Sequence, residues 1–216
     1  MADAATTLYL VRHGNTFESW ETPRQIGCQT DLALTSSGKD QAKKVGAYFK
    51  KQNVLPAKIF AGKLKRQAES ARLIASELNL NSNTVETLPL LDEIDYGVWE
   101  GLAPDEIKAE WPKEYADWTG RAEFDPMLVP ENVGERIAAI HSWIAALRGA
   151  FKPGSTVIAV TSNGVMRLFY SLLPKEWEEL KAKAKLDDLK VKTGNFSELK
   201  IDSKSVSVKR WNTSPA

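Results

Sequence analysis

The sequence has 216 residues, of which 43% are hydrophobic and 26% charged, and its formal net charge at pH 7 is +1. This composition is typical of a globular domain with a sizeable core, and the near-zero charge excludes a general attraction to nucleic acid or anionic lipid. The single cysteine, Cys28, excludes an intrachain disulfide and a cysteine-cluster metal site.

The N-terminal region predicts a buried strand followed by a long loop. Residues 1–5 lack the basic and apolar segments of a secretory signal, and no later run approaches the ~20 apolar residues of a membrane span, so we expect a cytoplasmic protein. The apolar run Leu8–Val11 is short and continuous, which is typical of a strand buried on both faces. The polar stretch Phe17–Gln29, with Pro23 and Gly27, is too long for a tight turn, and we expect it to cover a site.

Two amphipathic helices are predicted on either side of a second strand. Thr35 or Ser36 can cap the first helix. The apolar face of this helix is formed by Ala42, Val45 and Phe49. Ala57–Ala61, closed by Gly62, predicts the strand. The apolar stripe of the second helix is formed by Leu64, Ala68, Ala71, Ala75 and Leu78.

The middle of the chain predicts an edge strand and a helical insertion. Residues 81–90 have an extended pattern, but Pro89 restricts any strand there to the edge of a sheet or excludes it. Residues 104–130 are rich in Trp, Pro and charges and include a short helical stretch at 105–111. We expect this region to be an insertion or cap that lies over the sheet, so that residues 1–216 form a single domain.

The C-terminal part predicts a long helix, the strongest strand and a terminal hairpin. Val133–Leu147 has a helical pattern, and Ser155–Val160 is rich in β-branched residues. Glu198–Ile201 and Ser205–Trp211 alternate apolar and polar residues on either side of a short turn. Strands that alternate with helices favour an α/β fold with a layered, mostly parallel sheet.

Polar side chains follow the predicted strands at the points where these strands end. Arg12 and His13 follow the first strand, and Asn163 follows the strongest one. Arg66 lies in the first turn of a helix, where a cation opposes the helix dipole unless an anion is bound. Ligands of open parallel sheets bind at the carboxyl ends of strands, and imidazole beside arginine suits phosphoryl transfer. Each residue alone is compatible with a solvated surface position, so their common location is what indicates a site.

These residues occur in the order found in a known family. Arg12-His13-Gly14, the segments 31–42 and 64–71, and Glu93–Gly101 resemble the histidine phosphatase superfamily, in its phosphoglycerate mutase-like group. The resemblance covers most of the chain and implies a three-layer αβα sandwich with a mostly parallel central sheet. The variant Asp-Tyr-Gly-Val-Trp-Glu-Gly at 95–101 favours the phosphatase branch over the mutases.

The resemblance also implies roles for individual residues. His13 would accept the phosphoryl group as nucleophile, and Glu93 would act first as general acid and then as general base. Two guanidinium groups can take the place of a cation, so the resemblance implies no metal and no cofactor. The phosphate-binding residues would be Arg12, Arg66, Asn163, Asn15 and Ser19.

The sequence departs from the family pattern after the strongest strand. The family carries a second histidine there in a Ser-His-Gly context, whereas this chain has Ser162-Asn163-Gly164. Asparagine donates an amide hydrogen bond but carries no charge, so we expect weaker phosphate binding or slower phosphohistidine formation. His141 lies in a predicted helix, where we expect a structural role, and Cys28 is expected to be a packed or half-exposed thiol.

Three functions are compatible with these residues. The leading hypothesis is a histidine acid phosphatase-type hydrolase, which would act without a metal on a small phosphorylated metabolite through a phosphohistidine at His13. A second hypothesis, motivated by Asn163, is a catalytically impaired member that binds phosphorylated ligands or a protein partner. A phosphoglycerate mutase is the third. Neither nucleic acid nor a membrane is an expected partner.

Overall fold

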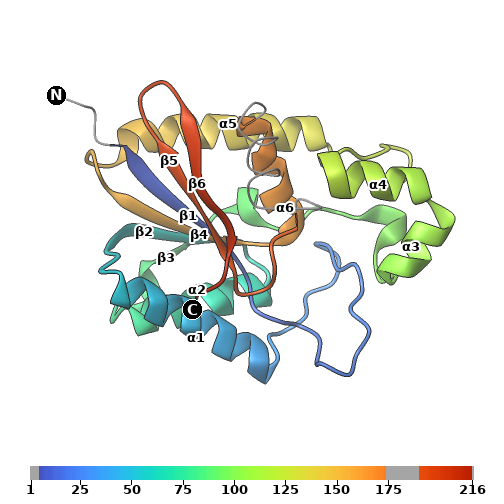
Figure 1. Cartoon of the computed structure of the whole chain (residues 1–216), viewed down its shortest axis with the longest axis horizontal. Coiled ribbons are helices and arrows are strands. Elements are labelled where there is room, and N and C mark those ends of the chain that lie inside the picture. Colours follow the sequence, from blue (N-terminus) through green and yellow to red (C-terminus); the bar gives the residue numbers. More distant parts are fainter. Residues whose placement is uncertain (1–4, 174–189, 216) are drawn as a thin grey trace.

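A six-stranded sheet with helices on both faces forms the centre of the protein (Figure 1). The computed structural model describes residues 5–173 and 190–215. The strands are Thr6–Arg12 (β1), Pro56–Ala61 (β2), Val85–Thr87 (β3), Thr156–Thr161 (β4), Phe196–Ile201 (β5) and Val206–Thr213 (β6). Their order across the sheet is β3-β2-β4-β1-β5-β6. The first four strands in this order are parallel, whereas β5 is antiparallel to β1 and β6 is antiparallel to β5.

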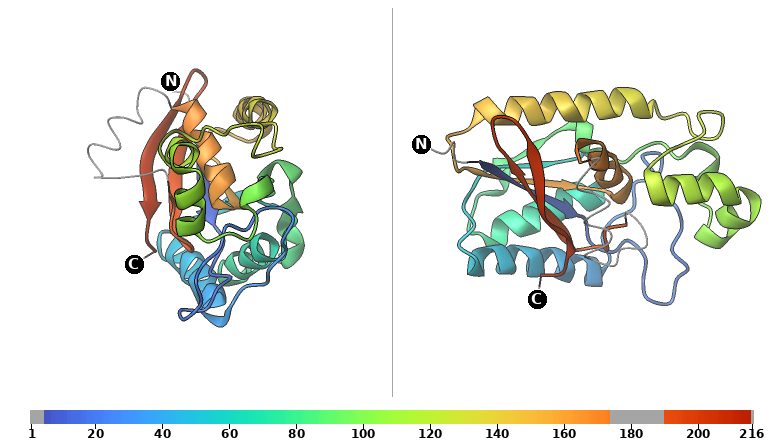
Figure 2. Two further views of the ribbon diagram at one scale, coloured as in Figure 1. Left: turned by 90° about the vertical axis from the view of Figure 1, so that its right-hand side faces the viewer. Right: turned by 45° about the horizontal axis from the view of Figure 1, so that its top comes forward.

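The helices form a layer on each side of this sheet. Helices α1 (Ser36–Lys51) and α2 (Lys65–Glu77) cover one face, and α5 (Val133–Ala150) and α6 (Asn163–Leu168) cover the other (Figure 2). The architecture is a three-layer αβα sandwich with a mixed, mostly parallel sheet, which confirms the predicted fold class. None of the helices described within 5–173 and 190–215 is both long and apolar enough to cross a membrane.

The central strand β1 contributes to the core on both faces because its side chains alternate. Tyr9 and Val11 belong to the core under α1 and α2, where the ring of Phe49 lies 4.7 Å from that of Tyr9. Leu8 and Leu10, both 0% exposed, belong to the larger core on the side of α5 and α6. The continuous apolar run of the sequence is therefore a strand buried on both faces, as predicted.

The middle of the chain differs from the prediction in one respect. The expected edge strand is β3, which ends before the 3₁₀ turn that begins at Pro89. The insertion contains α3 (Pro104–Glu110) and α4 (Pro112–Arg121), which lie beyond the end of the sheet rather than over one of its faces (Figure 1). The reason is aromatic packing: Trp118 of α4 stacks on Phe124 at 3.9 Å and packs against the ring of Tyr96.

Three parallel strands end together at the edge where polar residues follow them. Arg12 of β1 lies opposite Thr161 of β4, and Ala61 of β2 lies opposite Val160 of β4. The amide of His13 then donates to the Thr161 carbonyl at 3.1 Å. The segments that leave these strands therefore start from neighbouring points.

The segment after β1 packs against the start of α1 through two glycines. A Cβ on Gly38 would lie 2.2 Å from the carbonyl oxygen of Asn15, and one on Gly14 would lie 2.0 Å from the carbonyl oxygen of Gly38. The predicted cap is present, because the Thr35 hydroxyl accepts from the Gly38 amide at 3.1 Å. The backbone that follows His13 is thus held against α1 at a separation that only glycine allows.

We predict that Gly38→Ala destabilises the protein, although alanine is ordinarily the better helix residue. Displacing packed backbone costs about 1–3 kcal/mol, which exceeds the roughly 0.5–1 kcal/mol that Gly→Ala contributes within a helix. Gly149→Ala in α5 is the matched control, because a Cβ there meets no atom within 4 Å, and it should stabilise slightly. Urea unfolding measures both free energies. A Gly38→Ala protein as stable as the wild type would contradict this packing.

Candidate active site

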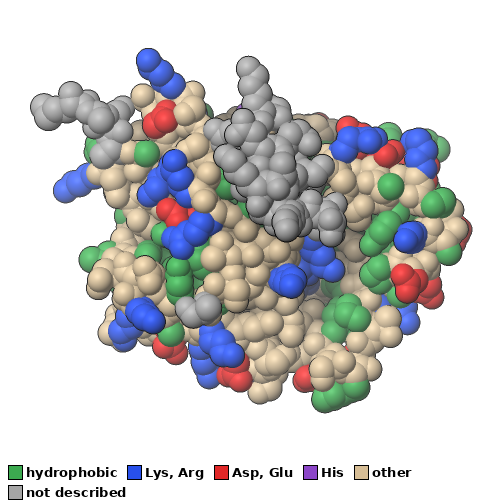
Figure 3. Space-filling view, in the orientation of Figure 1, with side chains coloured by type: hydrophobic (Ala, Val, Ile, Leu, Met, Phe, Trp, Pro, Cys, Tyr) green, Lys and Arg blue, Asp and Glu red, His purple; other side chains and the backbone are tan. Residues whose placement is uncertain are grey.

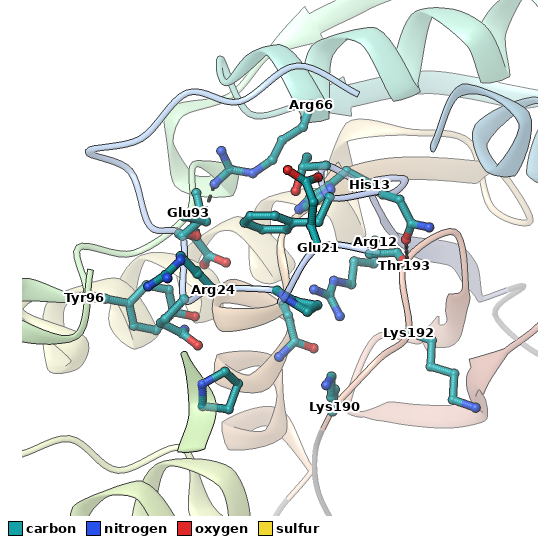
Figure 4. A pocket seen from close by; sticks show the side chains of 18 of the residues that line it. Arg12, His13, Glu21, Arg24, Arg66, Glu93, Tyr96, Lys190, Lys192 and Thr193 are labelled. Atoms are coloured by element: carbon teal, nitrogen blue, oxygen red, sulfur yellow. Dashed lines mark hydrogen bonds between the residues drawn. The ribbon is translucent and has the colours of Figure 1, made fainter. Parts of the chain in front are cut away.

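A cavity of about 630 Å³ lies at the carboxyl ends of the parallel strands. In the surface view, basic side chains border a hollow in this part of the molecule (Figure 3). The loop that was expected to cover a site forms one wall with Phe17 and Pro23, and α4 forms another. Every residue that the sequence assigned to catalysis or phosphate binding lines this one cavity: Arg12, His13, Asn15, Ser19, Arg66, Glu93 and Asn163. Figure 4 labels four of them, Arg12, His13, Arg66 and Glu93.

His13 is a buried, neutral imidazole. It follows β1 directly and is 5% exposed. Its Nδ1 lies 2.7 Å from the carbonyl oxygen of Gly14; because a carbonyl only accepts, Nδ1 carries the hydrogen and Nε2 keeps its lone pair. Burial lowers the pKa of His13 well below its ordinary value, and the charges of Arg66 and Arg12 lower it further. The ring is therefore an unprotonated nucleophile at neutral pH.

The two arginines on either side of His13 both donate to backbone carbonyls. Burial lowers the pKa of Arg12 to about 10, so its guanidinium stays protonated at neutral pH. Its Nη1 donates to the Val191 carbonyl at 2.6 Å. Arg66, which is 1% exposed, donates to the carbonyls of Thr30 at 2.9 Å and Gly27 at 3.0 Å. Both guanidinium groups line the cavity, and each also holds a neighbouring segment: Arg12 holds Val191, and Arg66 holds the loop that contains Gly27 and Thr30.

Glu93 is a buried carboxyl group whose acid form is favoured. It is 4% exposed, and its two oxygens accept from the backbone amides of Ile94 at 3.0 Å and Gly164 at 3.3 Å. Burial raises the pKa of Glu93 above its ordinary value, against the opposing effects of Arg66 and of these two hydrogen bonds. A carboxyl group that holds its proton can serve as a general acid.

The close approach of Glu93 to α6 requires a glycine at position 164. A Cβ on Gly164 would lie 2.4 Å from Glu93 Oε1 and 2.5 Å from the Tyr96 hydroxyl. The Ser-Asn-Gly sequence therefore ends in glycine because two polar groups of the cavity occupy the space where a side chain would be.

The neutral residues predicted to bind phosphate differ in how they are held. Asn163 is the first residue of α6, and its Oδ1 accepts from the Val191 amide at 2.9 Å, so the amide nitrogen is the end that can donate to a ligand. The oxygen of the Asn15 amide accepts from Thr193 and its nitrogen donates to Ser37. Ser19 is exposed at the cavity wall. The Asn15 side chain thus chiefly connects the segment that contains Thr193 to the start of α1.

The sequence did not identify some of the residues that line the cavity. Arg167 is 3% exposed, donates to the Thr119 carbonyl at 2.6 Å and lies over the ring of Trp118, which ties α6 to the insertion. It follows Asn163 by four residues, and residues at this spacing share one face of a helix. That spacing is the signal that could have found it. Tyr96, Lys190, Lys192 and Thr193 also line the cavity.

Neither His141 nor Cys28 lines the cavity. His141 is exposed on α5, where its Nε2 lies 3.3 Å from the Ser171 hydroxyl oxygen. Cys28 is half-buried, and burial raises the pKa of its thiol, with Asp95 adding to the rise. A thiol with a raised pKa is a weak nucleophile, in agreement with the expectation for Cys28.

Comparison with known proteins identifies the family. Residues 8–214 match the sequence profile of the family described as "Histidine phosphatase superfamily (branch 1)". The chain belongs to the histidine phosphatase superfamily. Among curated relatives, the chain is 28% identical over 206 residues to a 2,3-bisphosphoglycerate-dependent phosphoglycerate mutase of Bifidobacterium longum, covering 83% of this chain and 81% of the relative. It is 26% identical over 169 residues to phosphoserine phosphatase 1 of Hydrogenobacter thermophilus, covering 77% and 75%.

Solved structures share the fold of this chain. A mycobacterial glucosyl-3-phosphoglycerate phosphatase superimposes with a TM-score of 0.71 at 24% identity, covering 96% of this chain and 99% of that one. Bacillus stearothermophilus YhfR superimposes with a TM-score of 0.73 at 24% identity, covering 98% and 100%. The relatives thus include proteins named as phosphatases and proteins named as mutases.

We predict that Arg66→Met raises the pKa of His13. The charge of Arg66 is the largest electrostatic effect that lowers this pKa, and methionine removes the charge while filling much of the buried volume. NMR titration of the His13 ring should show protonation beginning at a higher pH. Lys65→Met is the control, because the Lys65 side chain is 67% exposed, and it should leave the titration unchanged. If the Arg66→Met titration matched that of the wild type, the electrostatic explanation would be wrong.

Proposed function

We propose that this member of the histidine phosphatase superfamily is a phosphomonoesterase of the histidine acid phosphatase type, which acts without a metal on a small phosphorylated metabolite. The observation that carries the proposal is the buried, neutral imidazole of His13 in a cavity with two guanidinium groups and a carboxyl group whose pKa is raised by burial. A neutral nucleophile, fixed positive charge and an acid are what transfer of a phosphoryl group requires.

In the first half-reaction the phosphoryl group moves from the ester to the enzyme. His13 Nε2 attacks phosphorus, a nitrogen–phosphorus bond forms and the bond from phosphorus to the ester oxygen breaks. Glu93 gives its proton to the departing alkoxide, which leaves as the alcohol. Arg12 and Arg66 balance the charge of the non-bridging oxygens as it develops. The amide of Asn163 adds a neutral donor.

In the second half-reaction water removes the phosphoryl group. The Glu93 carboxylate takes a proton from water, the water oxygen bonds to phosphorus and the nitrogen–phosphorus bond breaks. The electron pair returns to His13, inorganic phosphate leaves and Glu93 is again the neutral acid. Burial of Glu93 suits both steps, because a raised pKa makes the carboxyl group easier to protonate and its carboxylate a stronger base.

Two other functions each have one observation in their favour. The neutral Asn163, at a position where the family resemblance implies histidine, supports a member that binds phosphorylated ligands or a protein partner with little turnover. The relative named as a phosphoglycerate mutase supports a mutase, in which phosphorylated His13 would return its group to a second hydroxyl. A panel of phosphate esters, assayed with and without 2,3-bisphosphoglycerate, separates the three functions. Inorganic phosphate release supports the phosphatase, and primer-dependent isomerisation supports the mutase. Binding of phosphate analogues without turnover of any ester supports the binding member.

We predict that His13 carries a phosphoryl group during turnover. Mass spectrometry under alkaline conditions, after mixing with p-nitrophenyl phosphate, should find this group on His13 because a phosphoramidate bond survives alkali. His13→Ala should abolish the intermediate and lower turnover by at least about 10³-fold. His141→Ala is the control, since His141 lies outside the cavity. This variant should still form the phosphohistidine intermediate and should keep its turnover rate. Undiminished turnover in His13→Ala would exclude the proposed mechanism.

We predict that Glu93→Gln removes the alkaline limb of the pH profile of kcat/KM. Wild-type activity should fall as the pH rises through the raised pKa of Glu93, and it should also fall as the pH drops through the lowered pKa of His13. Glutamine does not ionise, so only the fall at low pH should remain. The loss should be about 10²–10⁴-fold for an alkyl phosphate and smaller for p-nitrophenyl phosphate, whose leaving group needs no proton. A profile that keeps both limbs would contradict the assignment of Glu93.

A further inference from the structure

The backbone of Val191 is held at both of its polar groups by residues of the candidate active site. Its amide donates to Asn163 Oδ1 at 2.9 Å, and its carbonyl accepts from Arg12 Nη1 at 2.6 Å. Two residues later, the Thr193 hydroxyl donates to Asn15 Oδ1. The segment 190–193 is therefore fixed by three side chains that the sequence assigned to phosphate binding.

This segment places lysines at the cavity. Val191 is 0% exposed, whereas its neighbours Lys190 and Lys192 are exposed and line the cavity wall. The two lysines differ in direction: in Figure 4, Lys190 lies beneath Arg12, whereas Lys192 extends away from the other labelled side chains. Of the two lysines, which both line the cavity, Lys190 is the one that in this view stays among the other labelled side chains, and it is therefore the candidate to add charge to the cavity.

A histidine at position 163 could not combine the two properties required here. Both ring nitrogens of an imidazolium donate, so the charged form has no lone pair to accept from the Val191 amide. A neutral imidazole can accept from that amide but brings no charge. The amide oxygen of Asn163 accepts from Val191 at 2.9 Å and does so regardless of pH. Asn163 can therefore anchor the segment but cannot supply charge to the cavity.

We propose that Asn163 is a positioning residue that anchors segment 190–193, and that Lys190 supplies the cavity with the positive charge that asparagine cannot carry. The proposal rests on the proposed function only in requiring that the cavity binds phosphate. In this proposal Lys190 attracts the phosphoryl group directly through its charge. Asn163 acts in two ways: its side-chain oxygen positions the segment through the Val191 amide, and its side-chain nitrogen donates to the ligand.

Binding of inorganic phosphate, measured by calorimetry, tests the role of Lys190 without any turnover. Lys190→Met should weaken binding about tenfold, as expected for loss of a charge-assisted contact. Lys190→Arg should bind nearly as the wild type does. Lys192→Met is the matched control, since it removes the same charge from the same segment, and it should change affinity by less than about twofold. Equal losses in Lys190→Met and Lys192→Met would overturn the proposal.

A double-mutant cycle tests the role of Asn163. Asn163→Ala should weaken phosphate binding about tenfold in the wild type but by no more than about threefold in the Lys190→Met background, where only the direct amide donor remains to be lost. Equal losses in both backgrounds would overturn the positioning role. Circular dichroism confirms that each variant is folded. A protein that binds phosphate with this coupling but hydrolyses no ester would contradict the proposed function and leave the inference intact.

Discussion

The parallel hydrogen bonding of β1 to β4 places Arg12 opposite Thr161 and ends both strands at the same edge of the sheet. The next bond, from the His13 amide to the Thr161 carbonyl at 3.1 Å, extends this pairing beyond the strands. As a result His13 faces the turn that begins α6 with Asn163. A slip of one residue would turn each of these side chains to the opposite face of the sheet. The cavity, the imidazole of His13 and the guanidinium of Arg12 within it all depend on this register.

Burial gives the site its reactivity because one poorly solvated environment acts on several groups in opposite directions. It lowers the pKa of His13 and of Arg12 and raises that of Glu93. In each of these three groups, burial stabilises the neutral form relative to the charged form. Of the three, only Arg12 has an ordinary pKa high enough for the group to stay charged at neutral pH. The two shifts have opposite signs: burial favours the neutral base form of His13 and the neutral acid form of Glu93, an arrangement that distinguishes the roles of two titratable groups.

The polar side chains of the cavity also hold its walls. Arg66 binds the carbonyls of the loop at 27–30, and Arg12 and Asn163 hold Val191 from its two sides. Arg167 does the same for the insertion through the Thr119 carbonyl. A buried cation needs partners in any case, and here these partners are the loops themselves. Replacement of one of these arginines is therefore expected to alter both the charge inside the cavity and the position of the loop that the side chain holds.

The sequence by itself determined the features that depend on short-range patterns. The run Leu8–Val11, the cap at Thr35 and the place of Arg66 in the first turn of a helix are all readable from neighbouring residues, and the family resemblance added Glu93. Tertiary structure alone decided which distant segments meet: Arg12 contacts Val191 and Asn15 contacts Thr193, although the residues of these pairs are 179 and 178 positions apart. Periodicity reports which side of an element is buried, but it carries no information about which loop will pack against that side.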